Sequence, residues 1–429
     1  MGINVDELME GMVLEKNIIR RDGALIVNKG TTLTPRIIER LRKLSGHINF
    51  EGNETTDMDE VKETVEESLR KDTENCLNDF FNNPTEAQVQ KIKDNADEIV
   101  EKTTQSNDPQ YDLNAYAEQE NGPGSHAVRV AFFSILLSKI YNDSLRTSNK
   151  KELINLQDVA VAALLQDAGT MYKDDNRLNT LTEIPNIKGM EQLFPGIKET
   201  PLDHYDERYT PVYSYCAVAD KNNISNSAKL MILLSKEPEN GKGPLKMPVS
   251  ISSRRNSILF GAKIINVCSV YDNAMKRAID NNTSLEDVVA ELGQYAINGS
   301  ISNEMKELLI NKVKLYPYRT RVLLSNGEVA TVETSRFGQY DSYKPVVRTC
   351  GFPRRRIDLK ENLNTTIKSV VSKDKFRGLV EQQIKDMKDI AGVGDSGRYK
   401  KRISIISAYS FFIFSSYRKL MNIIINNSI

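Results

Sequence analysis

The sequence holds few of the residues that usually build metal centres or disulfide frameworks. Its 429 residues include four cysteines, three histidines and no tryptophan. The cysteines are far apart and form no Cys-x-x-Cys pair, which excludes a zinc ribbon and a disulfide scaffold. Three histidines are few for a binuclear metal site, which usually combines several histidines with carboxylates. The chemistry of the chain therefore has to come from a small set of side chains.

The chain also lacks an excess of either charge. Lys plus Arg and Asp plus Glu both total 58, so no overall field attracts nucleic acid, and no DNA partner is expected. With 27% charged and 39% hydrophobic residues, the chain is not collagen, a polytopic membrane protein or a disordered polymer. The start of the sequence has no basic stretch followed by an apolar run. We therefore expect no signal peptide and a cytoplasmic location.

Changes of hydrophobic period divide the chain into five expected parts, and together they predict a mainly α protein. These parts are a small α/β module (1–52), a helical connector (53–119), a helical bundle (120–315), a small β appendix (316–371) and a helical, partly apolar tail (372–429). The connector could instead be a dimerising coiled coil, but its apolar register is short. No internal repeat is visible.

Local signals place several elements within these parts. Thr34 and Pro35 predict a helix start in the first module, and Ser125 is the expected N-cap of the first long helix of the bundle. The segment 159–165 is apolar on all sides, so we expect this helix in the middle of the bundle. Asn326-Gly327 predicts a hairpin turn between two strands of the appendix.

The tail contains an apolar stretch at 403–414 with basic residues on both sides. It is too short to span a bilayer as a helix. One interpretation is a helix that packs on the body or on a second copy. The other is peripheral membrane contact through 398–429, with the basic flanks facing anionic lipid.

Several short segments follow one another in the helical part. They are Ser-His126-Ala-Val-Arg-Val-Ala, Leu-Leu-Gln166-Asp167-Ala-Gly, Thr210-Pro211, Ser235-Lys236-Glu237 with Gly243-Pro244-Leu245, and Ser269-Val-Tyr-Asp272. Their order and spacing resemble the HD-GYP family, a branch of the HD phosphohydrolases that hydrolyse cyclic di-GMP. The similarity covers 120–315, and the modules before and after it resemble those often fused to this domain. The resemblance implies bacterial signalling and a site where two or three iron or manganese ions activate a hydroxide.

Most of the ligand positions that the resemblance implies have changed. His126 and Asp167 are kept as residual metal ligands, whereas the other positions carry Gln166, Thr210, Ser235, Lys236 and Ser269. Two ligands fall short of the three that a catalytic metal ion usually needs, and neutral oxygens do not replace imidazoles or carboxylates. A protonated lysine also repels a cation. The sequence therefore predicts a catalytically inactive regulator or scaffold without a metal cofactor.

Two alternatives stay open at this stage. The chain could be a divergent but active cyclic di-GMP phosphodiesterase that still holds two or three iron or manganese ions. His204, six residues before Thr210, could join its site through a shift in register.

The altered site could also bind cyclic di-GMP without cleaving it. Such binding would use a phosphate-binding cluster of Lys236, Lys242, Arg254 and Arg255. We favour the simpler interpretation, in which these four side chains are solvated. Asp272 is expected to cap or pair locally, and Arg354–Arg356 to be exposed.

Overall fold

The computed structural model describes most of the chain. The described residues are 18–20, 25–28, 31–43, 48–49, 65–106, 111, 113–118, 122–147, 152–186, 190–252, 256–333, 344–350 and 355–390. The chain forms two compact units, Met1–Lys62 and Glu63–Ile429. The expected division into five parts remains a prediction.

The first unit has the elements that its sequence predicts. Strands β1 (Ile18–Arg20), β2 (Leu25–Val27) and β3 (Ile48–Asn49) form an antiparallel sheet in the order β2-β1-β3, and helix α1 spans Pro35–Lys43. The helix begins at the expected proline, and the Thr34 hydroxyl accepts a hydrogen bond from the Ile37 N–H at 3.4 Å. The sequence also predicts a hairpin turn at Asp22-Gly23, but this turn and His47 lie outside the described residues.

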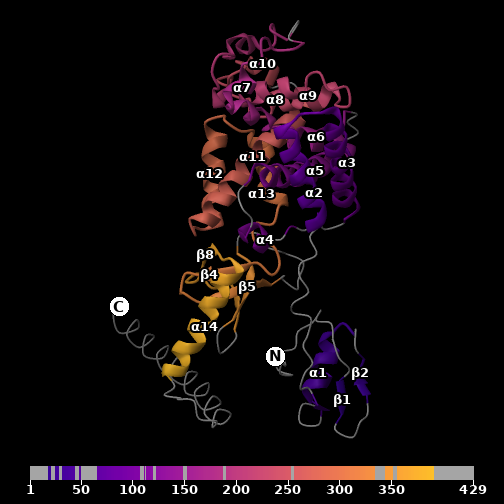
Figure 1. The fold of residues 1–429 in the computed structure, drawn as a ribbon. Coiled ribbons are helices and arrows are strands. Elements are labelled where there is room, and N and C mark those ends of the chain that lie inside the picture. The colour runs from indigo at the N-terminus through magenta and orange to yellow at the C-terminus, as the bar shows by residue number, and fades with distance from the viewer. Residues whose placement is uncertain are drawn as a thin grey trace, which may run out of the picture. The chain divides into compact units, whose positions relative to one another are not determined.

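The second unit is mainly helical (Figure 1). Its α-helices are α2 (Glu67–Asn82), α3 (Glu86–Gln105), α4 (Leu113–Glu118), α5 (Pro123–Thr147), α6 (Leu156–Leu165), α7 (Asp175–Leu178), α8 (Thr210–Val218), α9 (Asn226–Leu234), α10 (Val249–Ser252), α11 (Ser257–Asp280), α12 (Leu285–Ile297), α13 (Asn303–Lys312) and α14 (Lys373–Ile390). Short 3-10 turns are η2 (Ala168–Lys173), η3 (Pro195–Glu199) and η4 (Glu207–Tyr209). The expected mainly α class, with a small β appendix, is confirmed.

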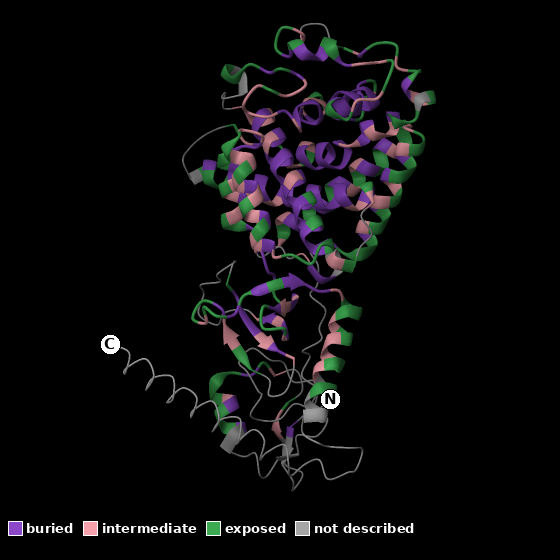
Figure 2. Ribbon diagram, turned by 90° about the vertical axis from the view of Figure 1, so that its left-hand side faces the viewer, coloured by how far each residue is buried: buried purple, intermediate pink, exposed green. Residues whose placement is uncertain are grey.

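Helix α6 lies in the centre of the bundle, as its apolar sequence predicts. Every side chain from Val159 to Leu165 is buried, and α3, α5, α9 and α11 pack around the helix. Figure 2 shows the buried residues concentrated in the middle of these helices. A helix with no polar face is stable only where neighbours cover it on all sides.

Helices α2 and α3 belong to the same core. We interpreted them as connector helices, but they pack on α5 and α6, and Leu77, Phe80 and Ile92 are fully buried among the bundle residues. Each has one apolar stripe, which requires a covering partner. The sequence shows the stripe but not the partner, and the bundle supplies it.

Helix α5 begins at Pro123, so the prediction of Ser125 as its N-cap was wrong. Proline fits the first turn of a helix because its fixed φ is helical and its missing N–H would be unsatisfied there. The N–H of His126 donates to the Gly122 carbonyl at 3.1 Å. His126 therefore lies within the first helical turn, on a rigid element.

The β appendix is a five-stranded antiparallel sheet in the order β7-β6-β5-β4-β8. Its strands are β4 (Arg321–Leu324), β5 (Val329–Glu333), β6 (Val346–Thr349), β7 (Arg356–Asp358) and β8 (Ile367–Val370). Gly327 has a φ of +84° in the predicted hairpin turn, a conformation that favours glycine. Strands β7 and β8 have at most four residues each, and the sequence analysis did not find them.

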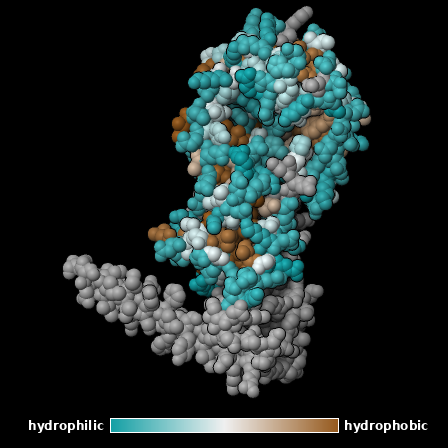
Figure 3. Space-filling model, turned by 60° about the vertical axis from the view of Figure 1, so that its left-hand side comes forward, coloured by the Kyte–Doolittle hydropathy of each residue, from teal (hydrophilic) through white to brown (hydrophobic). Residues whose placement is uncertain are grey.

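Helix α14 follows the sheet and packs on β4 and β5. None of the helices in the described part of the chain is long and apolar enough to cross a membrane. The expected joint at 392–397 and the apolar tail at 398–429 lie outside the described residues. The face of the molecule in Figure 3 is mainly hydrophilic, with separate hydrophobic areas.

Candidate functional site

The candidate site lies where four segments of the bundle meet. His126 comes from the first turn of α5, Asp167 from the residue before η2, and Lys236 from the turn that follows α9. Ser269 and Asp272 lie one turn apart on α11. The packing of α5, α6, α9 and α11 therefore brings together residues that are up to 146 positions apart in the sequence.

The inner half of the site is a closed network around Asp272. His126 Nδ1 lies 2.7 Å from Asp272 Oδ2, and Arg129 donates through Nε to Oδ1 at 2.8 Å and through a terminal nitrogen to Oδ2 at 3.1 Å. Burial alone would raise the pKa of the Asp272 carboxyl, but the bond to His126 and the charge of Arg129 hold it below its usual value. Asp272 is therefore a charged, fully partnered group that positions His126.

The outer half of the site surrounds Asp167. Lys236 Nζ donates to Asp167 Oδ1 at 2.5 Å, and His126 Nε2 lies 3.5 Å from Asp167 Oδ2 and 3.3 Å from the Ser269 hydroxyl. Burial acts to raise the pKa of Asp167, but Lys236 and His126 outweigh it and keep the pKa below its usual value. The imidazole of His126 thus lies between two carboxylates.

Of three other expected ligand positions, two bond to local partners and one has none. The Ser235 hydroxyl donates to the Ile232 carbonyl of its own helix, and the Thr210 hydroxyl donates to the Glu207 carbonyl and meets the Tyr205 hydroxyl at 2.7 Å. The Gln166 side chain is completely buried, and its amide oxygen and nitrogen have no partner among the described residues. In the described part of the chain, none of these three side chains forms a hydrogen bond to Asp167.

The possible phosphate-binding cluster is described only in part. Lys242 is exposed, whereas Lys236 is bonded to Asp167. Arg254 and Arg255 lie outside the described part of the chain. Lys236, which we expected to be solvated, is 37% exposed and is also bonded to a carboxylate that folding brings close.

His204 does not join the site. Its Nδ1 lies 2.8 Å from Asp203 Oδ1, and its side chain is 68% exposed. The register shift considered from the sequence is therefore absent, and Thr210 keeps the aligned position next to Pro211.

Glu237 fixes the loop that follows Lys236. Its carboxylate accepts hydrogen bonds from the N–H groups of Leu245 at 3.1 Å and Met247 at 3.0 Å. Gly243 lies against this carboxylate so closely that an added Cβ would be 2.3 Å from Glu237 Oε2. A residue with a side chain at 243 would therefore displace the loop, which holds Lys236 at one end.

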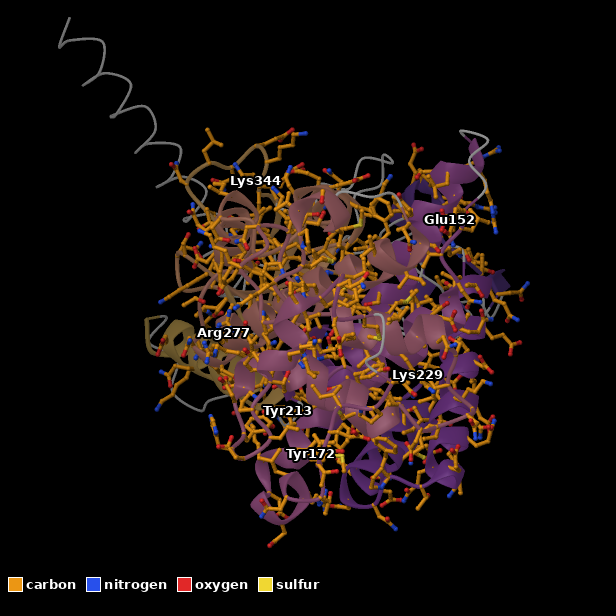
Figure 4. All side chains as sticks on the ribbon, turned by 90° about the horizontal axis from the view of Figure 1, so that it is seen from above. Glu152, Tyr172, Tyr213, Lys229, Arg277 and Lys344 are labelled. Carbon is orange, nitrogen blue, oxygen red and sulfur yellow. The ribbon has the colours of Figure 1, made fainter. Side chains whose placement is uncertain are left out.

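Several contributing residues were not found by sequence reasoning. Arg129 was quoted within the first motif but given no role, and Lys173 was not considered, although its charge also lowers the pKa of Asp167. Tyr205 stacks on Tyr213 at 5.2 Å between ring centroids and lies below Lys173 Nζ at 5.6 Å. Figure 4 shows Tyr172 and Tyr213 near one another, and their ring centroids are 6.1 Å apart.

The donor set does not fit a metal ion of the kind that the resemblance implies. One oxygen of Asp167 is bonded to an ammonium group, and both oxygens of Asp272 are bonded to Arg129. In the part of the chain that the structure describes, no group of three His, Cys, Asp or Glu side chains is placed to hold a metal ion. A catalytic ion usually has at least three protein ligands, whereas only His126 Nε2 and the second Asp167 oxygen face each other here.

Comparisons with known proteins give one structural similarity. No protein-family model and no curated protein matches the chain. Among solved structures, the chain is similar to Bd1817, described as an HDG"Y"P protein, from Bdellovibrio bacteriovorus. The similarity has 16% sequence identity and a TM-score of 0.39, and covers 72% of this chain and 97% of the other. That protein carries the name of the family that the sequence motifs resemble, but a similarity this weak does not by itself assign the chain to a family.

Proposed function

We propose that this chain is a catalytically inactive, HD-GYP-like regulator or scaffold in bacterial cyclic-nucleotide signalling. The observation that carries the proposal is the contact between Lys236 Nζ and Asp167 Oδ1 at 2.5 Å. A positive charge from the chain itself occupies the place beside Asp167 where a catalytic cation would be needed. An incoming cation would meet an ammonium group rather than a free carboxylate.

The remaining groups offer no obvious replacement for metal-activated hydroxide. His126 is the one imidazole at the site, and its two nitrogens face Asp272 and Asp167. A general base needs free access to a water molecule next to the substrate. Asp272 holds the ring through Nδ1, as an orienting carboxylate would, but Nε2 faces Asp167 and the Ser269 hydroxyl, so His126 serves here to connect α5 with α11.

An intact bundle with a neutralised site supports a role in binding. The proposed partners are another protein or a second copy of the chain, and cyclic di-GMP is the proposed nucleotide. Lys173 and Lys236 both act on Asp167 and are partly or fully exposed, so they are the described cations best placed to meet a phosphate there. We place this activity in the cytoplasm, with peripheral membrane contact through 398–429 as a proposal that deletion of that segment and cell fractionation would test.

Elemental analysis joined to an activity assay tests the proposal. Freshly purified protein is analysed for iron, manganese and zinc, and then assayed for hydrolysis of cyclic di-GMP with and without added Mn²⁺. We expect far less than one metal ion per chain and no turnover above the background of His126→Ala and Asp167→Ala. Stoichiometric metal together with turnover that both substitutions abolish would instead establish a divergent phosphodiesterase.

Isothermal titration with cyclic di-GMP separates the two forms of the proposal. Heat of binding without product formation would identify a nucleotide-binding regulator. The absence of heat at high micromolar nucleotide would leave a scaffold that acts through protein contacts alone.

A further inference from the structure

The pairing of Lys236 with Asp167 has a structural consequence beyond the loss of hydrolysis. We infer that the Lys236 ammonium is the tethered counter-cation of Asp167, a positioning residue that makes the order of the site independent of any metal ion. The inference rests on the proposed function, because it assumes that the site is metal-free in the working protein.

The geometry shows that this contact joins two different parts of the bundle. Asp167 follows the buried helix α6, and Lys236 follows α9, which packs on α6. The two residues are 69 positions apart. Their bond therefore fixes the ends of two neighbouring helices relative to each other at the same edge of the bundle.

Each carboxylate at the site has a bonded cation from the chain itself. Asp167 and Asp272 contribute two negative charges, and Lys236 and Arg129 contribute two positive ones, each bonded to one carboxylate. A carboxylate shielded from water is costly unless a cation or hydrogen-bond donors satisfy it. If Lys236 were removed, Asp167 would keep only His126 at 3.5 Å and the charge of Lys173.

The two partners differ in how far water can reach them. The Asp167 side chain is 15% exposed, whereas that of Lys236 is 37% exposed. Without its partner, the flexible lysine can turn its ammonium group into solvent, but Asp167 stays shielded. Removing the lysine should therefore cost more stability than removing the carboxylate, although both changes break the same bond.

Thermal unfolding of the full chain tests this asymmetry. The variants are Lys236→Gln, Asp167→Asn, the double variant Asp167→Asn/Lys236→Gln, and Lys236→Arg, which keeps the charge. Lys242→Gln is the matched control, because Lys242 is an exposed lysine six residues away. Each protein is measured in EDTA and in 1 mM Mn²⁺.

We expect Lys236→Gln to lower the Tm by roughly 3 to 8 °C. Asp167→Asn should lower it by less than half as much, and the double variant should resemble Asp167→Asn. Lys236→Arg should recover most of the loss, and Lys242→Gln should stay within about 1 °C of the unmodified protein. Mn²⁺ should leave the Tm of the unmodified protein unchanged.

The inference is overturned if Lys236→Gln is as harmless as Lys242→Gln, or if the effects of Lys236→Gln and Asp167→Asn simply add in the double variant. Lys236→Gln could fail to accumulate as folded protein. In that case, a folded double variant supports the pairing. If the double variant and Lys236→Arg both also fail to fold, the result counts against the pairing. Bound metal and turnover in the unmodified chain would sink the proposed function. If the unmodified chain is metal-free and inactive but Lys236→Gln leaves its Tm unchanged, only the present inference is contradicted.

Discussion

The two carboxylates beside His126 are held in different ways. Asp272 is completely buried and receives two bonds from Arg129 and one contact from His126. Asp167 is nearer to solvent and receives one bond, from a lysine that is 37% exposed. The contact between Asp272 and Arg129 is therefore buried in the protein interior. The contact between Asp167 and Lys236 lies nearer to the surface, between residues that folding brings together.

This difference indicates which half can change without loss of the fold. The planar guanidinium of Arg129 fits a carboxylate in a fixed geometry, whereas an ammonium group on a flexible stem adapts to its surroundings. Of the positions that depart from the HD-GYP pattern, Lys236 contacts Asp167 on the outer side. The inner pair can keep α5 and α11 together while the outer pair changes.

The comparison predicts that Arg129→Met has the largest effect. It leaves the Asp272 carboxylate buried without its main partner, which typically costs about 3–5 kcal/mol of unfolding free energy. Urea unfolding measures the change. The matched control is Arg356→Met, because Arg356 bonds Glu333 in the β appendix but is 48% exposed, and exposed pairs contribute about 0–1 kcal/mol. Equal losses in the two variants would contradict the distinction between buried and exposed pairs.

Acid should weaken the inner pair in a defined direction. The pKa of Asp272 is lower in the folded chain than its usual value near 3.9, so its stabilising contribution is present above that value and is lost as the pH falls through the folded-state pKa. Asp272→Asn removes this contribution. The difference in stability between the two proteins should therefore narrow by at most about 1.3 kcal/mol between pH 6 and pH 3.

Urea unfolding at several pH values measures this narrowing. Asp167→Asn should show the same direction, because the pKa of Asp167 is also lowered. A difference between unmodified protein and Asp272→Asn that stays constant down to pH 3 would mean that Asp272 gains no stabilisation from its charge.

Local patterns predicted the elements of the fold well. The uninterrupted apolar segment at 159–165 identified the central helix, and the Asn326-Gly327 turn identified the hairpin, because each signal lies within a few residues. Strand β7 was missed because its three residues, Arg356–Asp358, show no alternation of apolar and polar side chains. They form a strand because they pair with β6. Ser125 was expected to start the helix because Pro123 was assigned to a break before the bundle, whereas proline also fits the first turn of a helix, as it does here.

The site shows where reasoning from sequence reaches its limit. The motif order correctly brought His126, Asp167 and Ser269 together. It did not reveal that Asp272 pairs with Arg129, which lies 143 residues earlier, and it predicted a local partner instead. Lys236 was interpreted as solvated for the same reason: one sequence gives the chemistry of each side chain, but the distance between two side chains depends on how distant helices pack.

The smallest expected effect concerns the outer face of His126. Ser269→Ala removes one hydroxyl, 3.3 Å from His126 Nε2, and should cost about 0.5–1.5 kcal/mol, as for one neutral hydrogen bond. Ser138→Ala is the control, because the Ser138 hydroxyl is buried with no partner among the described residues and its loss removes no bond.

The chain has three histidines, so their imidazole NMR signals can be assigned by substitution. Ser269→Ala should shift the His126 signal and leave those of His47 and His204 in place. A loss as large as that of Arg129→Met would show that the outer half holds His126 as firmly as the inner half does.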